Sequence, residues 1–305
     1  MGDGILLRGI VEFSSFCNNN CFYCGLNNQN NILTRYRIPS EKIMEAVASI
    51  HAAHIKTVVL QSGEDDELDP FWLADLVRNI KRNFDMAVTL SVGEKTREEY
   101  QLWREAGADR YLLKMETSDP AIYAAAHFGR NLESRLKCHK DLAELGYQVG
   151  SGLIVGLRGQ TLETLARDIL FFKAMDYDMI GIGPLIPHPQ TVFADDPPGS
   201  VPLTLKVLAL TRIVARNTHL PATTALGSAG GYDYRIDGLK AGANVLMPNF
   251  TPAEYKKLYE IYPGKTCIDE SSSKCVSCMG AKVMSIGRYI QASAGHSLKK
   301  SYSFH

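Results

Sequence analysis

Three cysteines lie within eight residues near the start of the chain, in the run Cys-Asn-Asn-Asn-Cys-Phe-Tyr-Cys formed by Cys17, Cys21 and Cys24. Thiolates at this spacing can hold three irons of a four-iron, four-sulfur cluster, which leaves the fourth iron without a protein ligand. An iron with an open position can bind and activate a small molecule, whereas a fully ligated cluster usually only carries electrons. Structural zinc is the alternative, but it normally takes four protein ligands, and His51 and His54 are predicted to lie on the following helix.

A second triplet, Cys267, Cys275 and Cys278, lies near the C-terminus, and Cys138 stands alone. Clustering at metal-ligand spacing, in a chain with no evident signal peptide, favours metal binding over disulfides. We therefore expect the second triplet to bind metal, with adventitious zinc or plain thiols as alternatives. Cys138 falls in a helical pattern and is expected to be a small buried apolar residue.

The composition argues against several classes of partner. The 305 residues include 33 basic and 33 acidic side chains, so no basic surplus points to nucleic acid. No apolar run reaches the roughly 18 residues of a membrane span. The N-terminus lacks the basic and apolar regions of a signal peptide. We expect a cytoplasmic protein that binds neither nucleic acid nor a membrane.

Short apolar runs rich in β-formers alternate with helical patterns. Strands are predicted at 5–13, 57–61, 87–91, 110–116, 147–155, 179–183, 222–226 and 243–247. Helices are predicted at 41–54, 70–81, 97–106, 132–145, 162–175, 205–217 and 252–262. Eight such units in about 250 residues predict an α/β fold, the (β/α)8 TIM-type barrel. An open doubly wound sheet is the alternative, but no Gly-x-Gly-x-x-Gly run follows the first strand. We expect the barrel over 1–262 and a C-terminal extension with the second triplet over 263–305.

In such a barrel the chemistry lies in the loops at the carboxyl ends of the strands. The residue types suited to chemistry gather at these positions. The first triplet follows the first strand, and the next strands are followed or ended by Gly63 and Glu64, by Ser91, by Lys114, Met115 and Glu116, and by Thr223 and Thr224. The predicted fold therefore brings these residues to one end of the barrel.

The spacing C-x₃-C-x₂-C, with an aromatic residue before the last cysteine, resembles the motif of the radical SAM superfamily. The resemblance implies that Cys17, Cys21 and Cys24 ligate a 4Fe–4S cluster, and that S-adenosylmethionine (SAM) chelates the open iron through its amine and carboxylate. One electron from the cluster then cleaves the sulfonium to give methionine and a 5′-deoxyadenosyl radical. Tyr23 is implied to pack near the adenine.

Longer stretches resemble one family within that superfamily. The runs Val-Val-Leu-Gln-Ser-Gly-Glu-Asp, Met-Ile-Gly-Ile-Gly-Pro-Leu-Ile-Pro-His-Pro and Leu-Pro-Ala-Thr-Thr-Ala are similar to the HydE maturases of FeFe-hydrogenase. The resemblance extends roughly from Leu6 to Cys278, and the extra N-terminal helical segment of the family has no counterpart here. Biotin synthase and methylornithine synthase belong to the wider group.

The resemblance also implies which residues bind SAM. Gly63 and Glu64 match the motif that receives the SAM amino group, Glu116 matches an acidic residue that contacts SAM, and Arg135 matches the arginine that pairs with its carboxylate. Ser91 is expected among the cofactor-binding residues. A zwitterionic end needs an acidic and a basic partner, and a guanidinium fork suits a carboxylate. A solvated helix residue is the alternative for Arg135.

One pair departs from the family pattern. Lys114 and Met115 stand where HydE-type enzymes carry Arg-His, in a position that helps to hold an amino-acid-like substrate. Lysine keeps the charge but loses the bidentate fork, and methionine cannot carry a proton. Met179, Thr223 and Thr224 match family positions that line the substrate cavity, with ordinary strand packing as the alternative.

We therefore expect a HydE-like radical SAM enzyme that acts on a small, anionic, amino-acid-like substrate, organometallic or sulfur-containing. A methylornithine-synthase-like mutase or a biotin-synthase-like enzyme is the alternative within enzymes, and an iron–sulfur carrier or redox sensor is the alternative outside them. The resemblance implies an electron donor such as ferredoxin or flavodoxin, other maturation proteins as partners, and an auxiliary iron–sulfur cluster at Cys267, Cys275 and Cys278.

Overall fold

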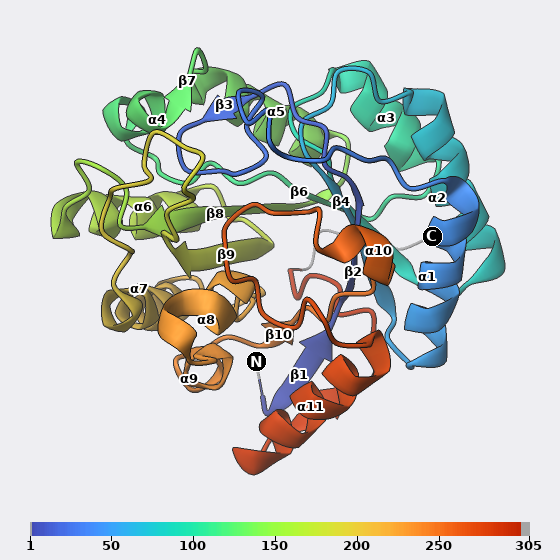
Figure 1. Ribbon diagram of the computed structural model, residues 1–305. Coiled ribbons are helices and arrows are strands. Elements are labelled where there is room, and N and C mark those ends of the chain that lie inside the picture. Colours follow the sequence, from blue (N-terminus) through green and yellow to red (C-terminus); the bar gives the residue numbers. More distant parts are fainter. Residues whose placement is uncertain (1, 300–305) are drawn as a thin grey trace.

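The computed structural model describes residues 2–299, and their central feature is a parallel sheet curled into a barrel (Figure 1). One sheet has the order β2-β4-β5-β6-β8-β9, with bounds Gly9–Ser14, Thr57–Ser62, Ala87–Ser91, Arg110–Leu112, Gln148–Val155 and Met179–Pro184. A second sheet has the order β10-β1-β11, with bounds Val245–Leu246, Gly4–Leu7 and Tyr289–Gln291. Spatial order follows chain order around the large sheet, as the predicted barrel requires.

Single bridges close the barrel where a seventh strand was predicted. The segment 219–222 makes parallel bridges to β9 and toward β10, at Met179↔His219, Ile182↔Ala222 and Pro221↔Val245. β10 then pairs with β1, and the first predicted strand is divided at Arg8 into β1 and β2. Backbone hydrogen bonds run through this part of the ring, for example from Ala222 N to Val245 O at 2.9 Å and from Leu6 N to Asn244 O at 3.0 Å, so the ring is continuous.

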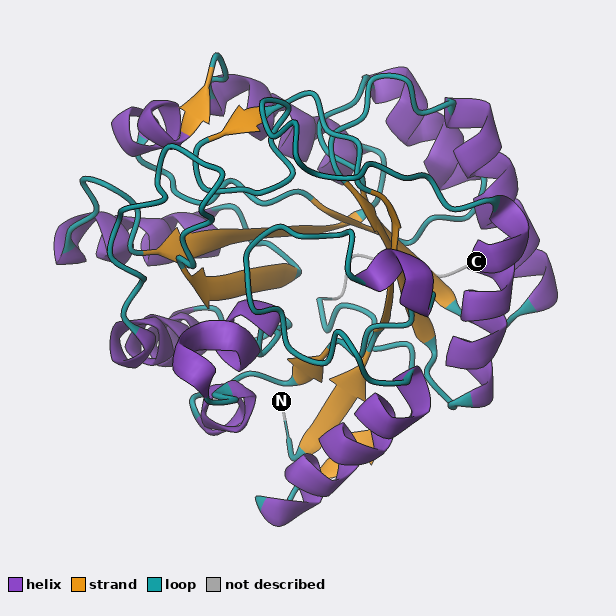
Figure 2. Cartoon of the chain, in the orientation of Figure 1, coloured by secondary structure: helices purple, strands orange, loops and turns teal. Residues whose placement is uncertain are grey.

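Helices cover the outside of the sheet, as Figure 2 shows. The main ones are α1 (Ser40–Ala52), α2 (Pro70–Asn83), α3 (Arg97–Glu105), α5 (Leu132–Glu144), α6 (Leu162–Ala174) and α7 (Val201–Val214). Side-chain caps fix several starts: Asp69 accepts a hydrogen bond from Phe71 N, and Thr96 and Glu99 form a capping box. α7 begins earlier than predicted because Ser200 caps it.

Two predicted elements are wrong. The predicted strand 222–226 is mostly the helix α8 (Thr224–Ser228), because the Thr223 hydroxyl accepts a hydrogen bond from Leu226 N at 3.4 Å and caps it. The predicted helix 252–262 ends after one turn, α10 (Ala253–Lys256), and the chain continues in turns. Further short elements were not predicted: β3 (Asn20–Cys21), α4 (Pro120–Ala126), β7 (His127–Phe128), η1 (Ala229–Gly231) and α9 (Arg235–Lys240).

The chain beyond the predicted barrel packs against it. α11 (Ser272–Ser285) lies beside β1 and β11 (Figure 1). The following strap, residues 289–299, crosses the amino end of the barrel, where Ala294 O accepts hydrogen bonds from Arg110 and Thr57 and Ser297 N donates to Gln148. The domain boundary at 262/263 stays a prediction. Within residues 2–299 no helix combines the length and the apolar character that crossing a bilayer would need.

Candidate active site

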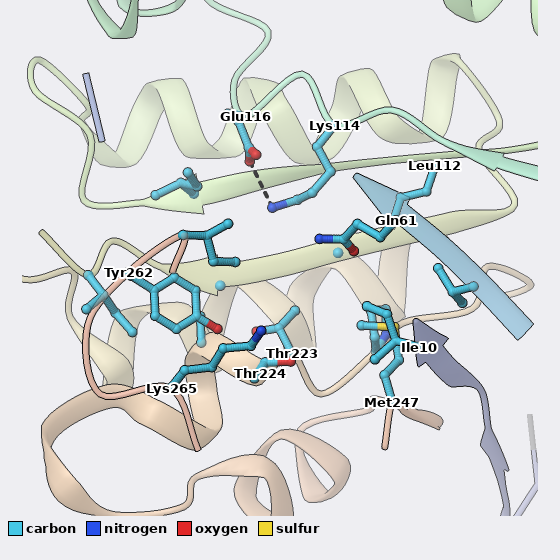
Figure 3. Close-up of a pocket in the computed structure, with 18 of the residues that line it drawn as sticks. Ile10, Gln61, Leu112, Lys114, Glu116, Thr223, Thr224, Met247, Tyr262 and Lys265 are labelled. Atoms are coloured by element: carbon cyan, nitrogen blue, oxygen red, sulfur yellow. Dashed lines mark ion pairs between the residues drawn. The ribbon is translucent and has the colours of Figure 1, made fainter. Parts of the chain in front are cut away.

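A cavity of 320 Å³ opens inside the barrel, with side chains from many elements around it (Figure 3). The predicted site residues that line it are Tyr23, Cys24, Lys114, Glu116, Met179, Thr223 and Thr224. These seven residues come from separate strands and loops, so the barrel brings them to one cavity, while Cys17, Cys21, Gly63, Glu64 and Arg135 lie outside its lining. Ser91 ends β5 half-buried, and Met115 packs in the hydrophobic core, outside the cavity lining.

The first cysteine triplet lies in the loop between β2 and α1, and all three thiols are free and half-buried. Backbone hydrogen bonds join this loop to Gly63 and Glu64, which follow β4. Asn18 N donates to Glu64 O at 2.8 Å, and Gly63 N donates to Ser14 O at 3.3 Å. A Cβ at Gly63 would lie 2.6 Å from Cys17 Cβ and still closer to the Phe16 carbonyl. Only glycine therefore lets the cysteine loop approach β4 this closely.

The three thiols are poor acids without a cation nearby. Burial raises the pKa of Cys24 to about 12. Burial also raises the pKa of Cys21 far above its usual value, with repulsion from the Cys24 and Cys17 thiolates adding to the rise. Three thiolates therefore form here only against compensating positive charge, which the irons of a cluster supply. The three cysteines are therefore suitable ligands for a 4Fe–4S cluster.

No three His, Cys, Asp or Glu side chains within residues 2–299 are placed to hold a metal ion. A four-iron cluster spreads its three cysteine ligands over three different irons, so those ligands need not converge on one point. The result therefore bears on single-ion sites such as zinc and not on a cluster.

Arg135 is a buried charge, and the alternative of a solvated helix residue is wrong. It is 7% exposed on α5. Its Nε donates to Glu94 Oε1 at 2.5 Å, and its Nη1 donates to Lys114 O at 2.7 Å. Glu64, also buried, pairs with Arg130 at 2.9 Å and accepts a hydrogen bond from Glu94 N at 2.7 Å. These residues form a network of two carboxylates and two guanidinium groups beside the cysteine loop.

Glu116 has a strained backbone, and one oxygen of its buried carboxylate accepts no hydrogen bond in the described structure. Its φ of 65° lies in the left-handed region, which costs a non-glycine residue about 1 kcal/mol. Hydrogen bonds from Glu116 N to Gly152 O and from Ile154 N to Glu116 O hold it there. Its Oε2 lies 2.9 Å from Lys114 Nζ (Figure 3), yet this buried oxygen has no well-directed hydrogen bond in the described structure. The carboxylate therefore has capacity for another polar group in the cavity.

The cavity lining also contains charged residues that the sequence analysis did not predict as site residues. Arg8 donates to Met179 Sδ at 2.7 Å, and Glu12 forms an ion pair with Lys265. Gln61 and Tyr262 also line the cavity. A charge within an apolar strand needs a partner, so the positions of Arg8 and Glu12 in the first predicted strand could have indicated that these residues form buried polar contacts. Lys265 carried none, because it follows the predicted barrel.

The comparisons with known proteins bear on this site. A family model for the radical SAM superfamily matches residues 11–172. The [FeFe] hydrogenase maturase subunit HydE of Thermotoga maritima is 47% identical over 290 residues, which cover 94% of this chain and 82% of that protein. The chain belongs to the HydE family. This membership makes it a radical SAM enzyme, a class that uses a 4Fe–4S cluster and SAM.

More distant relatives agree with the placement in the wider group. The 3-methylornithine synthase of Methanosarcina acetivorans is 28% identical to this HydE-family chain, over 84% of the chain and 72% of the synthase. A crystal structure of methylornithine synthase matches with a TM-score of 0.82 at 23% identity, over 95% of this chain and 85% of that one. The structural match shows that the two proteins share the barrel fold.

The second triplet of this HydE-family chain is unevenly exposed. Cys275 is buried on α11, Cys278 is exposed, and Cys267 is half-buried with a φ of 63°. A hydrogen bond from Cys275, and Arg235 at 3.8 Å from the sulfur, lower the pKa of Cys267 to about 6. The same contact raises the pKa of Cys275. An auxiliary cluster at this triplet stays a prediction.

Proposed function

We propose that the cavity holds SAM and a small substrate together, with the cluster bound by Cys17, Cys21 and Cys24. When bound, the cluster and SAM supply a one-electron cleavage that gives methionine and a 5′-deoxyadenosyl radical. The observation that carries the proposal is the lining of the cavity, which joins Cys24 and Tyr23 of the cysteine loop to Glu116 and Lys114 after β6. The barrel would shield this chemistry from water.

The acidic and basic side chains near the cysteine loop suit the amino-acid end of SAM. We assign Glu116 to the ammonium group, because its Oε2 is buried without a well-directed hydrogen bond in the described structure. Arg135, held by Glu94, is assigned to the carboxylate. Gly63 and Glu64 position the loop and the ammonium group, and Ser91 lies at the neighbouring strand end. The Tyr23 ring, whose hydroxyl lies 2.9 Å from His127 Nε2, is assigned to the adenine.

The substrate is proposed to be small, anionic and amino-acid-like, with an organometallic or sulfur-containing part, in hydrogenase-maturase chemistry. The support is the 47% identity to a hydrogenase maturase subunit. Lys114, Met179, Thr223 and Thr224 line the space left for it. The proposed partners are other maturation proteins and an electron donor such as ferredoxin or flavodoxin, in the cytoplasm. Met115 would act only by supporting Lys114 from the core.

The test is SAM cleavage by reconstituted, reduced protein under anaerobic conditions. The proposal expects 5′-deoxyadenosine and methionine in equal amounts, and an altered electron paramagnetic resonance signal of the cluster when SAM is added. An unchanged signal together with no 5′-deoxyadenosine would favour an iron–sulfur carrier or redox sensor instead.

A further inference from the structure

The cavity contains a second lysine that the assignments above do not use. Lys114 reaches the cavity from the segment after β6, and Lys265 reaches it from the opposite side, at the end of the segment 259–265 (Figure 3). Lys114 pairs with Glu116, on the wall assigned to SAM. Lys265 therefore provides positive charge on the wall that the SAM-binding residues leave free.

Lys265 is held in an unusually buried ion pair. The side chains of Lys265 and its partner Glu12 are 5% and 3% exposed. Removing two such charges from water costs several kcal/mol, and an apolar pair of similar volume is often no less stable. Fold stability alone therefore gives little reason for an ion pair at this position, which suggests a role in binding.

The partners of this pair leave the lysine with capacity for another contact. Glu12 is satisfied on both oxygens, by Lys265 and by Asn249 Nδ2 at 2.9 Å. The Lys265 ammonium has three hydrogens, and it donates to Glu12 and, in a long hydrogen bond of 3.4 Å, to the carbonyl of Tyr259, with the Tyr259 ring centroid 5.0 Å away. Thr223 and Thr224 line the same cavity as Lys265. An anion at this wall of the cavity would meet the Lys265 ammonium group.

We propose that Lys265 is a substrate-binding residue that holds the carboxylate of the substrate, with Glu12 as its counter-ion when the substrate is absent. The inference rests on the proposed function and deepens it, because it assigns the anionic end of the substrate to the wall opposite Glu116. The rest of the substrate then points toward the SAM side of the cavity.

The test is calorimetric binding of two probes to the reconstituted protein in the presence of SAM. S-methyl-L-cysteine carries a free carboxylate and no thiol that could bind iron, and its methyl ester is the same molecule with the carboxylate neutralised. Lys265→Met is expected to weaken binding of the acid about tenfold and to leave the ester unchanged, while Lys265→Arg restores most of the affinity. Lys257→Met is the matched control, because Lys257 is 64% exposed and pairs with Asp269 on the surface.

A second variant separates binding from a purely structural role. Glu12→Gln removes the carboxylate that competes for Lys265, so the acid is expected to bind several-fold more tightly. Lys265→Met leaves Glu12 buried without its counter-ion, so a lower melting temperature is expected in either case. If Lys265 only supports the fold, Lys265→Met will weaken binding of SAM and both probes alike, which overturns the proposal. Two further results overturn it as well. The parent protein could bind the acid and the ester equally, or Lys265→Met could bind the acid as tightly as the parent protein does. Failure of the proposed function is a different result, namely no 5′-deoxyadenosine from the parent protein.

Discussion

Single residues decide the chemistry of this barrel because each has been removed from water. Arg135 on α5 is almost fully buried against Glu94, although the helix as a whole faces solvent on its other side. Glu116 accepts a strained backbone that aims its carboxylate into the cavity. Strain and burial of this kind are maintained only where the surrounding structure over-determines them, which is typical of functional sites.

The two cysteine triplets are expected to differ in function. Cys24→Ala removes a ligand of the proposed catalytic cluster, so SAM cleavage should be abolished. Cys275→Ala lies on α11, whose residues do not line the cavity in the described structure, so cleavage should be nearly intact. The measurement is 5′-deoxyadenosine formed per protein under reducing conditions. Equal loss in both variants would contradict the division into catalytic and auxiliary sites.

Lys114 is expected to act mainly on the substrate. Lys114→Ala removes a positive charge from the cavity wall opposite Lys265, so the anionic S-methyl-L-cysteine should bind about threefold more weakly, a smaller loss than in Lys265→Met. SAM should be affected less, since the proposed contacts to SAM come from Glu116 and Arg135. Calorimetry with each ligand measures both effects. A larger loss of SAM affinity than of probe affinity would reject the assignment.

At the scale of elements, the strap 289–299 completes the barrel. β11 pairs with β1 in parallel register. In the strap, Ala294 O then accepts hydrogen bonds from Thr57 at the start of β4 and Arg110 at the start of β6, and Ser297 N donates to Gln148 Oε1 at the start of β8. Arg110 is fully buried and donates to Ala294 O at 2.6 Å. The amino end of such a barrel serves stability rather than chemistry. The strap therefore covers the amino end of the barrel, on the side away from the loops that carry the proposed active site.

Truncation after Gly287 is expected to destabilise the barrel strongly. Arg110 would lose Ala294 O, and Asp178 would lose the Ser297 hydroxyl, so a buried charge is left with fewer partners. Breaking a buried charge network typically costs roughly 3–5 kcal/mol. Thermal melting followed by circular dichroism measures the loss. Arg110→Met in the full chain is the control, and it should cost less because no charge is left without partners.

At the scale of the molecule, buried neutral histidines couple stability to pH. Burial lowers the pKa of His127, His139 and His296 to about 4 and that of His219 to about 3. The unfolded chain, in which histidine has its ordinary pKa near 6.5, then binds more protons than the folded chain between about pH 6.5 and 4. The free energy of unfolding should therefore be fully present above this window and fall as the pH drops through it.

One histidine gives a measurable share of this dependence. His139 lies 2.6 Å from both Tyr177 Oη and Leu113 O, and a lowering of its pKa to about 4 contributes about 2 kcal/mol of pH dependence between pH 7.5 and 5. Urea unfolding of cluster-free protein at the two pH values measures it. His139→Gln keeps polar groups there without a titrating one, so its loss on acidification should be smaller. An unchanged loss would show that His139 does not contribute.

The amino-acid sequence by itself determined the first cysteine triplet, the alternation of strands and helices, and most helix starts. These features depend on local spacing, hydrophobic periodicity and caps, all of which lie within a few residues. It failed at 222–226 and at 252–262, where a Thr223 cap and packing against the cysteine loop through Ile261 O and Gly25 N replaced the expected elements.

Only the tertiary structure decided which distant side chains share the cavity. The pairing of Lys265 with Glu12 joins residues 253 positions apart, and the contact of Arg110 with Ala294 joins residues 184 apart. No local pattern specifies such contacts, because they depend on how the ring of strands closes and where the chain returns. Burial then sets the energetic importance of each charge, and burial is a property of the folded barrel rather than of any segment.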